Sequence, residues 1–126
     1  MPQSVMLHEG SDVVVVEYFG SLVPEETRTS LDAIELIVQD RGLRKVLLDL
    51  SMVLKVTSNV DAFSHVYEVS RNKALGSLRY AFVRSGNMPG LSRLMTEAAN
   101  KRGVACRDFS TQEEALDWLN SPAESD

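Results

Sequence analysis

Residues 45–50 read KVLLDL, and this short run decides how the rest of the chain must fold. Apolar residues fill it except at Lys45 and Asp49. A strand that does not alternate between apolar and polar residues is typical of the interior of a parallel sheet, where both faces are buried. Parallel strands need long crossover connections, usually helices, so the flanking sequence should supply strands that alternate with helices.

The flanking sequence has this alternation. Upstream, a weak strand over 4–8 and a β-branched strand over 13–19 lie close enough to form a hairpin. A helix is predicted over 24–41, because proline suits its first turn and Gly42 its C-cap. The remaining predicted elements are a helix over 59–73, a strand over 78–84, a helix from 91 to about 103, a strand over 104–109 and a last helix capped by Ser110 and Glu113.

The predicted element order is therefore ββαβαβαβα. Such alternation requires parallel pairing through right-handed crossovers. We expect an α/β fold with one mixed, mostly parallel five-stranded sheet, its first strand antiparallel on an edge, and helices packed on the sheet. Residues 1–121 are predicted to form this single domain and 122–126 a flexible polar tail.

Composition limits the classes of partner. The chain has 126 residues and a net charge of −5, with no basic cluster of the kind that neutralises phosphates, so we expect no nucleic-acid partner. The lone Cys106 cannot form an internal disulfide. No apolar run approaches the roughly 18 residues of a membrane span, and no signal peptide is visible, so we expect a cytoplasmic protein.

No motif for catalysis, for a nucleotide or for a metal is found. The phosphate-binding loop, the dinucleotide fingerprint and the nucleophile elbow are missing, and one cysteine with two distant histidines leaves no metal-ligand cluster. Asp49 could act as an acid or base, but it has no obvious second carboxylate beside it. We expect no enzyme activity and no cofactor.

A site would most readily form where the carboxyl ends of the parallel strands meet at one rim of the sheet. Small and polar residues follow each predicted strand, and they equally suit turns and helix caps. The rim comprises Gly20 and Ser21, residues 51–58 with Ser51, Thr57 and Ser58, residues 85–90 with Ser85, Gly86, Asn87 and Gly90, and Ser110 and Thr111. Asn59 follows it at the start of the next predicted helix.

Three stretches resemble the STAS superfamily, in particular its small bacterial SpoIIAA-like branch. They are FGSLVPEETRTSLDAI, RKVLLDLS and RDFSTQEEALDWL, and RYAFVRSGNMPGLSRLMTEAA adds to the likeness. The resemblance implies a non-enzymatic regulatory domain that acts by binding proteins.

In antagonist members of this superfamily a serine within D-S-S-G is phosphorylated, which breaks the complex with the partner. The alignment implied by the resemblance puts Thr57 at the Asp, Ser58 at the phosphorylated serine, Asn59 at the second serine and Val60 at the Gly. Only Ser58 matches the pattern. Ser58 and Asp61 also form a helix capping box, so Ser58 is either a cap alone or a cap with a regulatory role.

The predicted loop over 51–58 is unusually apolar. Its residues Met52, Val53, Leu54 and Val56 would form a binding patch or a pocket wall if exposed, and otherwise pack under the next helix. The SpoIIAA-like branch is related in fold to CRAL-TRIO lipid-transfer domains.

Two hypotheses follow. The first is a protein-interaction domain that uses residues 51–60 and the second helix, with self-association through the apolar loop or the edge strand as one form of it. The second is a carrier or sensor of a small apolar or anionic ligand at the carboxyl rim.

Overall fold

The computed structural model describes residues 3–8, 12–56 and 59–121, with side chains for all of these except residues 3, 59–62 and 89. The elements, in chain order, are β1 (Gln3–Leu7), β2 (Val13–Leu22), α1 (Pro24–Arg41), β3 (Lys45–Val56), α2 (Asn59–Arg71), α3 (Lys73–Gly76), β4 (Arg79–Val83), α4 (Pro89–Lys101), β5 (Ala105–Phe109) and α5 (Gln112–Asn120).

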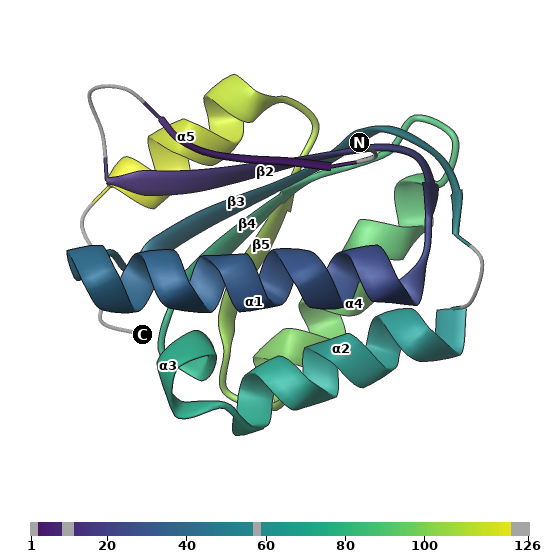
Figure 1. The fold of residues 1–126 in the computed structure, drawn as a ribbon. Helices are drawn as coiled ribbons and strands as arrows, with labels where there is room; N and C mark the ends of the chain where they lie inside the picture. The colour runs from purple at the N-terminus through teal and green to yellow at the C-terminus, as the bar shows by residue number, and fades with distance from the viewer. Residues whose placement is uncertain (1–2, 9–11, 57–58, 122–126) are drawn as a thin grey trace.

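The five strands form one sheet in the order β1-β2-β3-β4-β5 (Figure 1). β1 pairs with β2 in the antiparallel sense, and the other three pairings are parallel. KVLLDL lies at the centre of this sheet, where Val46 and Leu47 are fully buried. The predicted α/β class and the antiparallel edge strand are confirmed.

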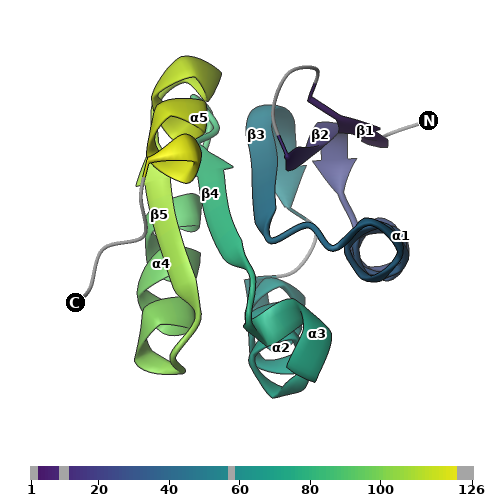
Figure 2. The same ribbon diagram turned by 90° about the vertical axis from the view of Figure 1, so that its left-hand side faces the viewer.

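Helices cover the two faces of the sheet unequally. α1, α2 and α3 lie below the sheet in Figures 1 and 2, and α5 lies above it. The larger core is formed by one face of the strands together with α1, α2, α3 and α4, around residues such as Ile34 and Leu48. The smaller core joins the other face to α5, which packs on β3, β4 and β5.

The prediction of a loop beginning at Ser51 was wrong, because β3 continues as a strand to Val56. β2 is also longer than predicted and ends at Leu22, and the two ends pair beyond the point where β3 leaves β4. We call this extension, residues 19–22 with 52–56, the β2–β3 ribbon. Two register shifts interrupt its pairing, and Gly20 lies at one of them with a φ of 70°, a value that glycine adopts without strain.

Two smaller predictions also need correction. The cap of α5 is Thr111 rather than Ser110, because the Thr111 side chain accepts the backbone N–H of Glu114. The predicted pairing of Ser110 with Glu113 is therefore shifted by one residue. The predicted helix over 59–73 ends at Arg71, where Asn72 caps the separate short helix α3.

Candidate functional site

Asp49 is held by hydrogen bonds on both of its carboxylate oxygens. Oδ1 accepts the backbone N–H of Ser51 at 2.8 Å, and Oδ2 accepts from Nε2 of Gln112 at 2.6 Å. The register shift after Asp49 takes the Ser51 N–H out of the regular ladder, and the carboxylate supplies its partner. Asp49 is only 7% exposed, and both of its carboxylate oxygens are satisfied from within the protein.

A second carboxylate does lie beside Asp49, which corrects the sequence-based expectation. Glu17 in β2 pairs with Asp49 in the parallel register, and its Oε2 accepts from the same Gln112 amide at 3.0 Å. The sequence held the necessary signal, because two adjacent parallel strands of known order bring equivalent residues together. Gln112 was missed because its role depends on where α5 crosses the sheet.

The described rim residues lie in strands, at helix starts and in the connection between β4 and α4. Ser85, which is fully buried, donates to the carbonyl of Val53 at 2.8 Å, and its Oγ accepts the backbone N–H of Asn87 at 3.1 Å. Ser110 donates to Glu114 at the start of α5. The remaining rim residues have these positions: Gly20 and Ser21 lie within β2, Ser51 is exposed in β3, Gly86 is exposed and Gly90 is half-buried at the start of α4.

The apolar residues of the ribbon divide between its two sides. Val53 is fully buried and Val56 is half-buried, as expected for residues that pack under a helix. Met52 and Leu54 are 61% and 66% exposed, and Phe19, which pairs with Met52, is 37% exposed. We call Phe19, Met52 and Leu54 the ribbon patch. It extends the sheet face on which Glu17 contacts α5.

A partly open cavity with about 90 Å³ of accessible space lies between the sheet and helices α1, α2 and α4. Strand residues such as Leu48 and Phe82 form one wall, and Leu31, Val66 and Met95 face them from the helices. α2 packs on α1, α3 and α4, which sets it back from the strands. The cavity therefore lies under the helices, and it reaches Leu22 and Val56, which are the last residues of β2 and β3.

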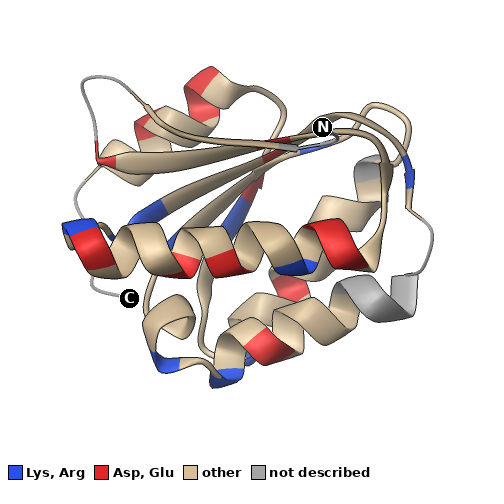
Figure 3. Ribbon diagram, in the orientation of Figure 1, with Lys and Arg blue, Asp and Glu red and all other residues tan. Residues whose placement is uncertain are grey.

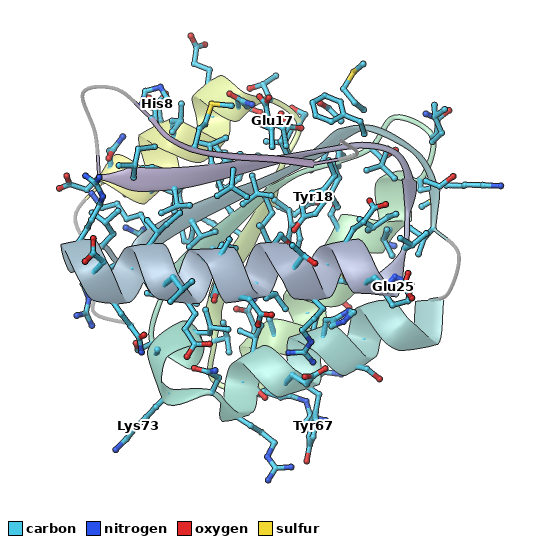
Figure 4. All side chains as sticks on the ribbon, viewed as in Figure 1. His8, Glu17, Tyr18, Glu25, Tyr67 and Lys73 are labelled. Carbon is cyan, nitrogen blue, oxygen red and sulfur yellow. The ribbon has the colours of Figure 1, made fainter. Side chains whose placement is uncertain are left out.

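Two tyrosines and a cysteine supply polar atoms to the strand wall of the cavity. Tyr18 points from β2 into the space between the sheet and α1, on the opposite side from Glu17 (Figure 4). Burial raises the pKa of Tyr18 to about 12, although its hydrogen bond to Ser30 opposes the rise. Burial likewise raises the pKa of Tyr80, and that of Cys106 to about 12. All three groups stay neutral at physiological pH.

The cavity was not predicted from the sequence. The available signal was two tyrosines, Tyr18 and Tyr80, at inward positions of predicted strands whose other inward residues carry no polar group that needs a partner. Tyrosine at such a position needs a partner for its hydroxyl and often marks a local polar spot in a core.

Acidic and basic residues both occur on the helices that face the viewer in Figure 3, and along α1 the acidic residues outnumber the basic ones. Within the described ranges, no group of three or more His, Cys, Asp or Glu residues is arranged to hold a metal ion. Among those same residues, no helix is both long and apolar enough to cross a bilayer.

Solved structures share this architecture. One is an uncharacterised protein of the DUF3478 family from Shewanella loihica, which has a SpoIIAA-like fold; it is 18% identical, with a TM-score of 0.62 and coverage of 93% of both chains. The other is the anti-sigma factor antagonist SpoIIAA in its unphosphorylated form, 15% identical, with a TM-score of 0.61 over 94% of this chain and 99% of that one. The chain has a SpoIIAA-like, or STAS, fold. No family model and no curated protein matches the sequence.

The residues that the resemblance suggested as a switch come directly after the ribbon in the chain. The switch residues suggested by the sequence, Thr57 and Ser58, directly follow β3 and lie outside the described residues. Asn59 is the first residue of α2. The ribbon patch and the proposed switch segment are thus neighbours in the chain.

Proposed function

We propose that this chain is a non-enzymatic regulatory domain that binds a protein partner through the ribbon patch. The proposal rests mainly on the exposure of Met52, Leu54 and Phe19 side by side on one sheet face. Large apolar side chains that gather on a surface are typical of protein-binding sites. Two of the three come from consecutive outward positions of one strand, which holds them in a fixed arrangement.

The coverage of the sheet supports the same surface. α5 packs on β3, β4 and β5, and the ribbon extends beyond the end of β4. A partner helix or strand could therefore approach the ribbon patch without displacing α5. Burying three such side chains would contribute on the order of 2–5 kcal/mol to binding, before the cost of association.

The chemistry of the interior supports a non-enzymatic role. Asp49 has both carboxylate oxygens committed to protein donors, and Cys106 is buried with a raised pKa. A thiol in this state is a poor nucleophile.

The test compares the binding of the wild-type chain with that of Met52→Asp and Leu54→Asp. Each immobilised protein would be exposed to an extract of the source organism, and the retained proteins quantified by mass spectrometry. Leu36→Asp is the matched control, because Leu36 is 70% exposed on α1, away from the ribbon. We expect one partner to be retained by the wild type and the control, and to be lost from both ribbon variants. Equal retention by all four proteins would contradict the proposal.

Self-association is a special case of this proposal. Met6 and Leu7 are exposed on β1, the edge strand, so a second copy could also pair there. Sedimentation velocity of the wild type, Met52→Asp and Met6→Lys separates the two surfaces. A dimer that dissociates in Met52→Asp uses the ribbon patch, whereas one that dissociates only in Met6→Lys uses the edge.

As a second candidate function, we propose that the domain binds a small apolar molecule in the cavity. Protein interiors contain few voids larger than a water molecule. The cavity between the sheet and the helices has about 90 Å³ of accessible space, and its lining is mainly apolar, which suits an apolar molecule. Xenon, which enters apolar cavities irrespective of hydrogen bonding, provides the test. We expect xenon to shift the methyl NMR signals of Leu31 and Met95, and no shift at saturating pressure would contradict this function.

A further inference from the structure

The direction of the hydrogen bonds in the cavity wall indicates which ligands it can accept. Ser30 donates from Oγ to the carbonyl of Thr27 at 2.8 Å. A hydroxyl has a single proton, so Ser30 has none left for Tyr18, whose oxygen lies 2.5 Å away. Tyr18 must therefore be the donor in that contact. Its phenolic oxygen is then left with lone pairs only.

Tyr80 is arranged in the same way. It donates its hydroxyl proton to the carbonyl of Leu75 at 2.7 Å. Both phenols line the cavity, and each has committed its proton to a protein acceptor. Because both groups are buried and neutral, these protons stay in place over the physiological pH range.

The other polar groups that line the cavity do not give its strand wall a strong hydrogen-bond donor. Cys106 lies in the strand wall, 3.6 Å from the hydroxyl of Thr96, and a thiol is a weak donor. The hydroxyl of Thr27 is directed at the carbonyl of Val23, at the longer distance of 3.4 Å. His65 belongs to the opposite wall, on α2, and has its own interaction. The strand wall therefore offers acceptors.

We propose that the cavity selects a small uncharged molecule that carries a hydroxyl group, and that it discriminates against ketones and carboxylates of the same size. This inference rests on the second candidate function above. A ligand hydroxyl can donate to Tyr18 or Tyr80, whereas a carbonyl or carboxylate would be buried against acceptor oxygens with no proton to share. The accessible space of about 90 Å³ is below the ~150 Å³ of a cavity that admits benzene, which favours a short alcohol.

Matched probes of nearly equal shape test the selectivity. 2-Butanol, 2-butanone and butyrate would be titrated into the wild-type protein, with methyl NMR shifts as the readout. We expect 2-butanol to bind about tenfold more tightly than 2-butanone, the ratio typical of one neutral hydrogen bond, and butyrate not to bind. Equal affinities for the alcohol and the ketone, or binding of butyrate, would overturn the inference. Xenon binding in the same sample would then still support the cavity as a site.

Two variants test whether Tyr18 causes the preference for 2-butanol over 2-butanone. Ser30→Ala removes the acceptor of the Tyr18 proton, which becomes available to a ligand, so the preference for 2-butanol over 2-butanone should disappear or reverse. Tyr18→Phe removes the oxygen altogether and should weaken 2-butanol binding while leaving xenon binding intact. Circular dichroism checks that each variant is folded. If both folded variants keep the wild-type ratio of affinities for 2-butanol and 2-butanone, the assignment to Tyr18 is wrong. If Tyr80→Phe also leaves this ratio unchanged, the whole inference is overturned.

Discussion

Gln112, the first residue of α5, donates a hydrogen bond from Nε2 to Oδ2 of Asp49 in β3 over 2.6 Å. Its second amide proton is available to Glu17, which accepts at 3.0 Å. One neutral side chain thus separates and satisfies two carboxylates on adjacent strands. The contact also fixes the start of α5 to the sheet at the point where β3 leaves its regular pairing.

Replacing Gln112 should therefore destabilise the fold. In Gln112→Ala, Asp49 keeps only its bond to Ser51 and lies beside Glu17 without the intervening donor. We expect the free energy of unfolding, measured by urea denaturation, to fall by about 1–3 kcal/mol. Glu113→Ala, at an exposed position of the same helical turn, is the control and should stay within about 0.5 kcal/mol of the wild type. Equal losses in the two variants would mean that the amide has no special role.

Stability should decrease at alkaline pH. Burial raises the pKa of Cys106 from 9.0 to about 12 and that of Tyr18 from 10.0 to about 12, and it also raises the pKa of Tyr80. Below about pH 9 these groups are protonated in both states. Above it the unfolded chain loses protons that the folded chain retains, which favours unfolding.

Urea denaturation between pH 8 and pH 11 measures this loss. We expect the free energy of unfolding to fall steadily above about pH 9, and to fall less steeply in Tyr18→Phe, which lacks one of the three groups. A free energy of unfolding that stays constant up to pH 11 would show that these groups are not held neutral by the fold.

Filling the cavity should stabilise the protein and abolish ligand binding. Ala99 is buried in α4 and lines the cavity, and methionine at this position can extend into the void. We expect Ala99→Met to raise the free energy of unfolding by about 0.5–2 kcal/mol and to remove the xenon-induced NMR shifts. The control is Ala98→Met, one residue earlier in the same helix and outside the cavity lining. Unchanged xenon binding in Ala99→Met would contradict the position of the cavity.

Substitutions of Ser58 test whether this residue regulates partner binding. A negative charge immediately after the ribbon should disturb a partner seated on Met52 and Leu54. We expect Ser58→Glu to weaken partner binding more than tenfold, with Ser64→Glu, at an exposed position of α2, as the control. If Ser58 acts only as a helix cap, Ser58→Ala will instead lower the stability by about 0.5–2 kcal/mol and Ser58→Glu will leave binding unchanged.

The fold could be predicted because its signals are local. The apolar run over 45–50 indicates a buried parallel strand, and the proline and glycine at the ends of α1 mark its bounds. The extension of β3 was missed for a physical reason. Its residues change from burial on both faces to burial on one, and the register shifts break the simple alternation expected of a strand.

The sites depend on tertiary distances that no local pattern encodes. Whether Met52 is exposed depends on how far α5 extends over the sheet, and the cavity depends on how α2 packs against its neighbouring helices. The pairing of Glu17 with Asp49 is different, because the strand order and direction alone would have been enough to predict it.

The ribbon is a single layer of two strands, and its two sides serve different surfaces. Met52 and Leu54 face outward, while Leu22 and Val56 of the same strands line the cavity. A molecule that moves Val56 from within would also move the strand that presents Leu54. The two proposed binding events would then be thermodynamically coupled, and linkage requires the coupling to be reciprocal: a ligand that strengthens partner binding tenfold would itself be held tenfold more tightly by the complex.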